Sequence, residues 1–150
     1  LLNRADAYEI NVRLELPTSQ GFGMSAAGLV AVALAFHQLT EKGSIEQYYR
    51  LAHRIERIHS GGLGDVLGIY AGGVELRLNA GAPVSPGKAV GFPCNQKILL
   101  VWIPQESRHT SEYIDDPIWQ QTITSAGEEA VNLLQQGDWN YEKWPQLLQC

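Results

Sequence analysis

Apolar and polar residues alternate near the start of the chain. From Tyr8 to Leu16 the even positions are apolar or aromatic, and the odd positions are polar. Alternation with period two is typical of a strand that has one face in water. We therefore expect a strand at 8–16. Pro17 should end it, because proline cannot donate the next hydrogen bond of a ladder.

The next two stretches have a helical pattern. Ser25 to Leu39 is rich in Ala and Leu and lacks proline, which predicts a helix buried on nearly all sides. Ser44 and Gln47 have the spacing of a capping box, and apolar residues then recur at helical intervals up to His59. The sequence therefore predicts a second, amphipathic helix from about 45 to 59.

The remaining elements are shorter, apart from a last helix. We expect a short helix capped by Asp65 and ending near Tyr70, where the pattern changes to strand-like alternation. The further predictions are a strand at 74–78, a loop at 79–93, a buried strand at 97–103 and a helix at 118–136. This order of strands and helices indicates an α+β fold.

Charge and composition exclude several classes of partner. The 150 residues include 11 basic and 16 acidic ones, a net charge of −5. A basic surplus for gripping nucleic acid or an anionic membrane is therefore missing. The longest apolar run, Ala26 to Phe36, is about half of the ~20 residues that a membrane span needs. Cys94 and Cys150 form neither a disulfide framework nor a zinc motif. We expect a cytoplasmic protein that binds neither nucleic acid nor membranes.

A glycine-containing loop, 17–23, connects the predicted first strand to the first helix. In the plainest interpretation its glycines only allow a tight turn. Gly21-x-Gly23-x-x-Ala26 also matches the dinucleotide-binding fingerprint, but the half-polar strand before it and the intervening Pro17 disfavour that interpretation. The third interpretation is a phosphate cradle, in which backbone N–H groups and the start of a helix bind an anion. Ser25 would then cap the helix or bind a magnesium ion on the phosphates.

The loop sequence resembles a known signature. Pro17-x-x-x-Gly21-Phe22-Gly23-Met24-Ser25-Ala26-Ala27 is similar to the Pro-x-x-x-Gly-Leu-Gly-Ser-Ser-Ala motif of the GHMP small-molecule kinases, with Phe22 and Met24 as departures. The resemblance implies that ATP phosphates are bound here and that Ser25 contacts Mg²⁺. The implied nucleotide-binding residues are Gly21, Phe22, Gly23, Met24, Ser25, Ala26 and Ala27.

Two acidic residues provide the other parts that a kinase needs. Glu56 is expected on the solvated face at the end of the second helix, and Asp65 follows a glycine-rich loop nine residues later. Each has a plainer interpretation: Glu56 pairs with Arg50 or Arg57, and Asp65 only caps a helix.

The residues around the acidic pair carry a resemblance of their own. The stretch from Glu56 to Asp65, followed by Gly72-Gly73, is similar to a segment of the mevalonate kinases, although it is two residues shorter. The resemblance implies that Glu56 binds Mg²⁺ and that Asp65 is the catalytic base or orients the acceptor.

Within the superfamily, the stretch from Leu16 to Pro83 is most similar to archaeal pantoate kinases. The resemblance implies an N-terminal domain at 1–93 with a ribosomal protein S5 domain 2-like fold. It also implies the start of a ferredoxin-like α+β C-terminal domain at 94–150, with the family's first strands and last third outside these residues. The implied activity is ATP-dependent phosphorylation of the pantoate 4-hydroxyl on the archaeal route to coenzyme A.

The acceptor side of the site is open to several assignments. His59, Gly64 and Arg77 are candidate substrate contacts, with Arg108 and His109 as other cations for a substrate carboxylate. Mevalonate, homoserine and shikimate are alternative acceptors, and a non-catalytic nucleotide or sugar sensor on the same scaffold is an alternative function. A homodimer is a further possibility that the sequence leaves open.

Overall fold

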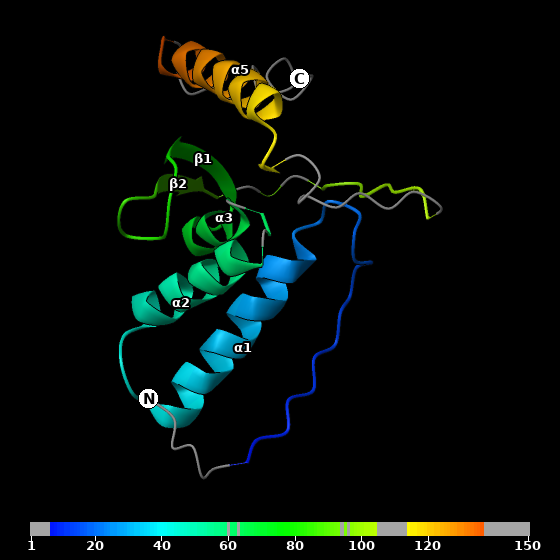
Figure 1. Cartoon of the computed structure of the whole chain (residues 1–150), viewed down its shortest axis with the longest axis vertical. Coiled ribbons are helices and arrows are strands. Elements are labelled where there is room, and N and C mark those ends of the chain that lie inside the picture. Colours follow the sequence, from blue (N-terminus) through cyan, green and yellow to red (C-terminus); the bar gives the residue numbers. More distant parts are fainter. Residues whose placement is uncertain are drawn as a thin grey trace. The chain divides into compact units, whose positions relative to one another are not determined.

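The computed structural model describes residues 7–59, 61–62, 64–93, 95, 97–104 and 114–136. Within them the chain forms three helices, a pair of strands and a last helix (Figure 1). The elements are α1 (Met24–Thr40), α2 (Ile45–Ile58), α3 (Asp65–Ala71), β1 (Val74–Asn79), β2 (Lys88–Phe92) and α5 (Pro117–Gln136). This mixture of helices and an antiparallel sheet confirms the α+β class.

The chain divides into two compact units, Leu1–Ser111 and Glu112–Cys150. The first contains every element from α1 to β2, and the second contains α5. The domain boundary expected at residue 93 stays a prediction.

The core of the first unit lies where α1, α2 and α3 meet. Figure 1 shows α1 and α2 lying side by side. Small side chains on α1, such as Ala26 and Ala33, allow close approach of the helices, and Tyr48 of α2 fills the space beside them. The buried cluster consists of Ala26, Val30, Ala33, Tyr48, Ala52 and Val66. Helix α1 is thus buried along one face, whereas Leu39 on another face is 61% exposed. The prediction of burial on nearly all sides is wrong.

The ends of α2 and α1 follow local sequence signals. The Ser44 side chain accepts a hydrogen bond from the backbone N–H of Gln47, and the Gln47 side chain accepts one from the backbone N–H of Ser44. This confirms the capping box. Helix α1 ends at Glu41, which has a φ of 52° and donates its backbone N–H to the carbonyl of His37. The Tyr48 hydroxyl and Thr40 Oγ1 are 3.0 Å apart, which joins the C-terminal end of α1 to α2.

Strands β1 and β2 form an antiparallel pair, with Leu76 opposite Val90. The expectation of a loop throughout 79–93 is therefore wrong. Proline and glycine dominate the first part of that segment, but β2 itself finds a ladder partner in β1. At Gly91 an added Cβ would overlap the backbone carbonyls of Ala71 and Gly72, so glycine there lets β2 pack against the end of α3.

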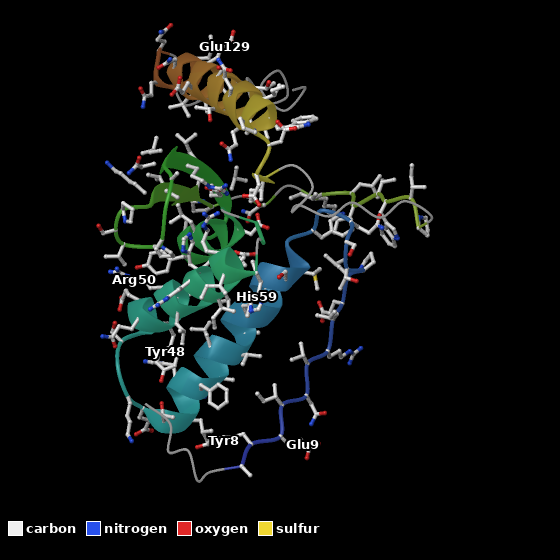
Figure 2. All side chains as sticks on the ribbon, in the orientation of Figure 1. Tyr8, Glu9, Tyr48, Arg50, His59 and Glu129 are labelled. Carbon is white, nitrogen blue, oxygen red and sulfur yellow. The ribbon has the colours of Figure 1, made fainter. Side chains whose placement is uncertain are left out.

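The segment from Tyr8 to Leu16 is not a strand in the structure. It runs alongside α1 (Figures 1 and 2), and residues 8–13 line a cavity of about 350 Å³ together with Ala31, Val32, Ala35, Phe36 and Leu39 of α1. Ile10 and Val12 are 54% and 52% exposed. A strand is part of a β-ladder, and the only ladder among the described residues joins β1 to β2. The sequence of this segment alternates like that of a strand, but the segment is not part of a sheet.

The prediction of a buried strand at Lys97–Ile103 is also wrong. This segment forms no regular structure, and Leu99 is 86% exposed. The cause is the same as for the first segment, because an apolar run becomes a buried strand only where neighbouring strands cover it.

Helix α5 confirms the prediction of a helix at 118–136, starting one residue earlier at Pro117. The Asp116 side chain accepts hydrogen bonds from the backbone N–H groups of Ile118 (2.8 Å) and Trp119 (3.3 Å), which stabilises the first turn. Among the described residues, no helix combines the length and apolar character needed to cross a membrane.

Candidate functional site: a glycine loop and two carboxylates

The glycine loop turns into α1 through residues with left-handed backbone conformations. Gly21 and Gly23 have φ values of 78° and 63°, which glycine adopts without steric cost. Gly23 is the N-cap of α1, and its carbonyl accepts the first helical hydrogen bond from Ala27 at 2.9 Å. The N–H groups of the first turn have no acceptor within the helix. The loop therefore presents N–H groups and the positive end of the helix dipole at one place, as a phosphate site requires.

Ser25 lies in the first turn of α1 and is exposed. Of the two roles expected for Ser25, that of helix cap is wrong, because no side chain caps this helix. The neighbouring Ala26 is 0% exposed, and therefore only its backbone could contact a ligand. The Phe22 ring packs edge-on against Trp102 with centroids 5.9 Å apart, which indicates a packing role for this departure from the family motif.

Asp65 lies against the glycine loop. A Cβ added to Gly23 would come within 3.4 Å of Asp65 Oδ2, and one added to Gly62 would come within 2.7 Å of the same oxygen. The carboxylate thus fits between two bare stretches of backbone. Asp65 is the first residue of α3, whose N-cap is Gly64, and no side chain caps that helix. The interpretation of Asp65 as only a helix cap is therefore wrong.

Glu56 lies in the last turn of α2 and is 2% exposed. This corrects the expectation of a solvated position. Gly61 covers it: its N–H donates to the Glu56 carbonyl at 2.9 Å, and a Cβ there would lie 2.6 Å from Glu56 Cγ. Burial, and secondly the charge of Asp65, raise the pKa of Glu56 to about 7.

The environment of Glu56 fits a bound cation. Its Oε2 atom is buried without a hydrogen-bond partner, and the negative charge of Asp65 is close enough to act on it. A divalent ion would satisfy this oxygen and offset the repulsion between the carboxylates. The described residues contain no group of three or more His, Cys, Asp or Glu that could hold a metal ion. Two carboxylates are fewer than such a group, and Mg²⁺ is an ion that proteins often bind through one or two carboxylates, with water and phosphate oxygens completing its shell.

The candidate acceptor contacts lie in different settings. Arg77 of β1 reaches the amino end of α3, because a Cβ on Gly64 would overlap its guanidinium. This brings Arg77 next to the residue that precedes Asp65. His59 is exposed at the end of α2 (Figure 2), and its backbone N–H donates to the carbonyls of Ile55 and Glu56. Arg108 and His109 lie outside the described residues.

The sequence interpretation did not single out Glu75. It lies in β1 and accepts a hydrogen bond from Arg77 Nη2. The available signal was the spacing of two residues, which places both side chains on the same face of a strand.

Comparison with known proteins gives the family context. Residues 1–73 match the N-terminal domain of the GHMP kinases. The pantoate kinase of Thermococcus kodakarensis is 44% identical over 120 residues, which cover 80% of this chain and 39% of that protein. The pantoate kinase of Methanocaldococcus jannaschii is 30% identical over 129 residues, 86% of this chain and 46% of that protein.

A third relative, the pantoate kinase of Methanospirillum hungatei, is 37% identical over 78 residues, 49% of this chain and 27% of that protein. No solved structure shows significant similarity to the chain. The chain spans less than half the length of the curated relatives that it matches. Residues 1–73 of the chain are therefore similar to the N-terminal domain of the GHMP kinases, and the similarity to pantoate kinases continues past that domain.

Proposed function

We propose that the protein containing this chain is an ATP-dependent kinase that phosphorylates the 4-hydroxyl of pantoate. One observation carries the proposal: the Asp65 carboxylate lies against Gly23 of the glycine loop, with the buried Glu56 nearby. A phosphate-binding backbone and two carboxylates at one place are the parts that phosphoryl transfer needs. The three pantoate kinases that resemble the chain support the choice of acceptor.

The first turn of α1 would bind the phosphates. Its backbone N–H groups need no lysine to hold an anion, because the helix dipole adds to their attraction. Ser25 and Glu56 would hold Mg²⁺, since one offers an exposed hydroxyl and the other a buried oxygen without a partner. The ion, when bound, would neutralise charge on the transferred phosphoryl group.

Asp65 would orient the attacking hydroxyl and accept its proton. Its position at the mouth of the glycine loop supports this role, because the acceptor must lie in line with the last phosphate. Arg77 would bind the pantoate carboxylate, and Gly64 would allow it to come close to the backbone. His59 remains a candidate contact at the end of α2.

Two alternatives differ from this proposal in kind. The acceptor could instead be mevalonate, homoserine or shikimate, which have hydroxyls but differ in skeleton and charge. A sensor would bind nucleotide without transferring phosphate and would not need a carboxylate against the loop. The contact between Asp65 and Gly23 favours the enzyme. A cytoplasmic location and a homodimer stay predictions.

An acceptor screen with the full-length protein tests the proposal. ATP consumption is measured in the presence of Mg²⁺ with pantoate and with the three other alcohols. We expect turnover with pantoate that exceeds turnover with each of the others by at least about tenfold. Preference for another alcohol would reject the acceptor, and nucleotide binding without turnover on any of the four would favour the sensor.

A further inference from the structure

Glu75 is a carboxylate that the proposed reaction does not use, and it lies close to the acceptor side of the site. It stands two residues before Arg77 in β1, so both side chains project from one face of the strand. Arg77 Nη2 donates a hydrogen bond to Glu75 Oε1. The other oxygen, Glu75 Oε2, is buried and has no hydrogen-bond partner in the structure.

The amino end of α3 presents bare backbone to this pair. Gly64 and Gly68 are four residues apart and therefore lie on the same side of the helix. A Cβ on Gly64 would overlap the Arg77 guanidinium, and a Cβ on Gly68 would come within 3.2 Å of Glu75 Oε1. Glu75 and Arg77 therefore lie close against α3, directly beside the residue that carries the proposed catalytic carboxylate.

The pair leaves Arg77 able to bind an anion. A guanidinium has five N–H donors, and a carboxylate partner on one edge leaves others available. The Arg77 side chain is 39% exposed, whereas that of Glu75 is 21% exposed. The carboxylate thus forms the inner member of the pair and the guanidinium the outer one.

Holding an arginine in place matters for binding. A free arginine side chain samples many rotamers and loses that freedom when it binds a ligand. A guanidinium that is already held by a carboxylate and packed against helix backbone has few rotamers left to lose, so its binding to a ligand costs less conformational entropy. Glu75 also has an orphaned buried oxygen, which lowers stability. Stability alone therefore does not account for a carboxylate at this position.

We propose that Glu75 is a positioning residue, which fixes the Arg77 guanidinium at the amino end of α3 so that it binds the carboxylate of the acceptor. The inference rests on the proposed function, because it requires an acceptor with a carboxylate. It assigns no chemistry to Glu75 itself. Its effect on binding must pass through Arg77.

Direct binding tests this without relying on turnover. Calorimetric titration of the full-length protein compares pantoate with its amide, which has the same skeleton without the negative charge. The variants are Glu75→Ala, Glu75→Gln, Arg77→Ala and the double variant. Glu129→Ala, which removes an exposed carboxylate on α5 (Figure 2), is the matched control.

We expect Glu75→Ala to weaken pantoate binding by about 10-fold to 100-fold, the usual range for a charge-assisted hydrogen bond, and to change amide binding by less than about threefold. Glu75→Gln keeps an oxygen acceptor for Arg77 and should lose less affinity than Glu75→Ala. In the Arg77→Ala background, Glu75→Ala should have no further effect. The control should bind both ligands like the wild type.

Three results would overturn the inference. The first is an unchanged pantoate affinity in Glu75→Ala, and the second is an equal loss of affinity for pantoate and for the amide. The third is a loss of pantoate affinity on Glu75→Ala that is as large in the Arg77→Ala background as in the wild type. Turnover of the same samples judges the proposed function separately. If the protein turns over pantoate but Glu75→Ala does not weaken pantoate binding more than amide binding, the positioning role is rejected and the proposed kinase activity stands. If Glu75→Ala weakens pantoate binding more than amide binding but the protein does not turn over pantoate, the positioning role is supported and the proposed kinase activity is rejected.

Discussion

At the scale of single residues, the site depends on where a few carboxylates are buried. Glu56 and Asp65 come from different helices, yet each lies close to glycine backbone: Gly61 for Glu56, and Gly23 and Gly62 for Asp65. The result is one buried carboxyl group whose pKa is raised to about 7 beside an exposed one.

Replacing Asp65 tests its role in catalysis. In the full-length enzyme, Asp65→Ala should lower kcat by about 10²-fold to 10⁴-fold, because the hydroxyl loses its proton acceptor and its orientation. ATP affinity should change by less than about threefold, since the backbone of the loop binds the phosphates. Steady-state kinetics and a separate ATP titration measure the two effects. Turnover close to that of the wild type would exclude the assignment.

Replacing Glu56 tests the electrostatic effect of its burial. A carboxyl group whose folded pKa is about 7, against 4.5 when unfolded, contributes stability below pH 4.5 that is lost as the pH rises through 7. Without Mg²⁺, Glu56→Gln should therefore unfold like the wild type near pH 4.5. At pH 8 it should be more stable by on the order of 3 kcal/mol, because each pH unit between a pKa of 4.5 and one of about 7 corresponds to about 1.36 kcal/mol. Urea denaturation at several pH values measures this.

The matched variant for that experiment is Glu129→Gln, in which an exposed carboxylate on α5 is replaced. Its free energy of unfolding should differ from that of the wild type by less than about 0.5 kcal/mol at every pH. If the two variants behave alike, burial does not control the ionisation of Glu56.

At the scale of secondary-structure elements, local signals and long-range pairing differ in how well they can be predicted. Helix α2 forms where its apolar spacing and capping box predict it, and α5 forms at the predicted range of 118–136, starting one residue earlier. The segments 8–16 and 97–103 have strand-like patterns but do not form strands, and among the described residues the β-ladder joins β1 to β2 alone. Residues 88–92 form β2 because β1 pairs with them.

The capping box of α2 has a measurable contribution. Ser44→Ala should lower the free energy of unfolding by about 1 kcal/mol, because the N–H of Gln47 loses its acceptor. Ser125→Ala in the exposed interior of α5 is the control. It removes a hydroxyl without removing a cap and should change stability by less than about 0.5 kcal/mol. Equal losses in the two variants would show that the cap makes no special contribution.

At the scale of the whole molecule, ligand binding should stabilise the fold. If ATP and Mg²⁺ bind the glycine loop and Glu56, they bind the folded state alone. Ligand at about 100 times its Kd should then add about 2.7 kcal/mol to the free energy of unfolding of the full-length protein. Chelation of Mg²⁺ should remove much of that gain.

Thermal melts with ATP, with ATP and Mg²⁺, and with ATP and a chelator make this comparison. Glu56→Gln should reduce the difference between the last two conditions. A Tm that rises equally with and without Mg²⁺ would contradict the assignment of Glu56 as a metal ligand.

The sequence alone determined the structural features that depend on residues close together in the chain. Helical spacing, the Ser44 capping box and the glycine-to-helix turn are short-range, because their hydrogen bonds join residues within about four positions. The candidate phosphate site was likewise visible in the sequence, since a glycine turn followed by a helix places backbone N–H groups where an anion can bind. Asp65 and Glu56 became candidates before any contact was known because the stretch from Glu56 to Gly73 resembles a segment of the mevalonate kinases.

Tertiary structure decided burial, pairing and proximity. Gly61 packs against Glu56, which is buried at the end of α2, and the placement of α3 brings Asp65 to Gly23 and Arg77 to Gly64. The pairing of β2 with β1 likewise depends on a partner that the pattern of β2 does not reveal. The physical reason is common to all three: desolvation and hydrogen bonding across the fold depend on which groups meet, and residues distant in sequence meet only after the chain has folded.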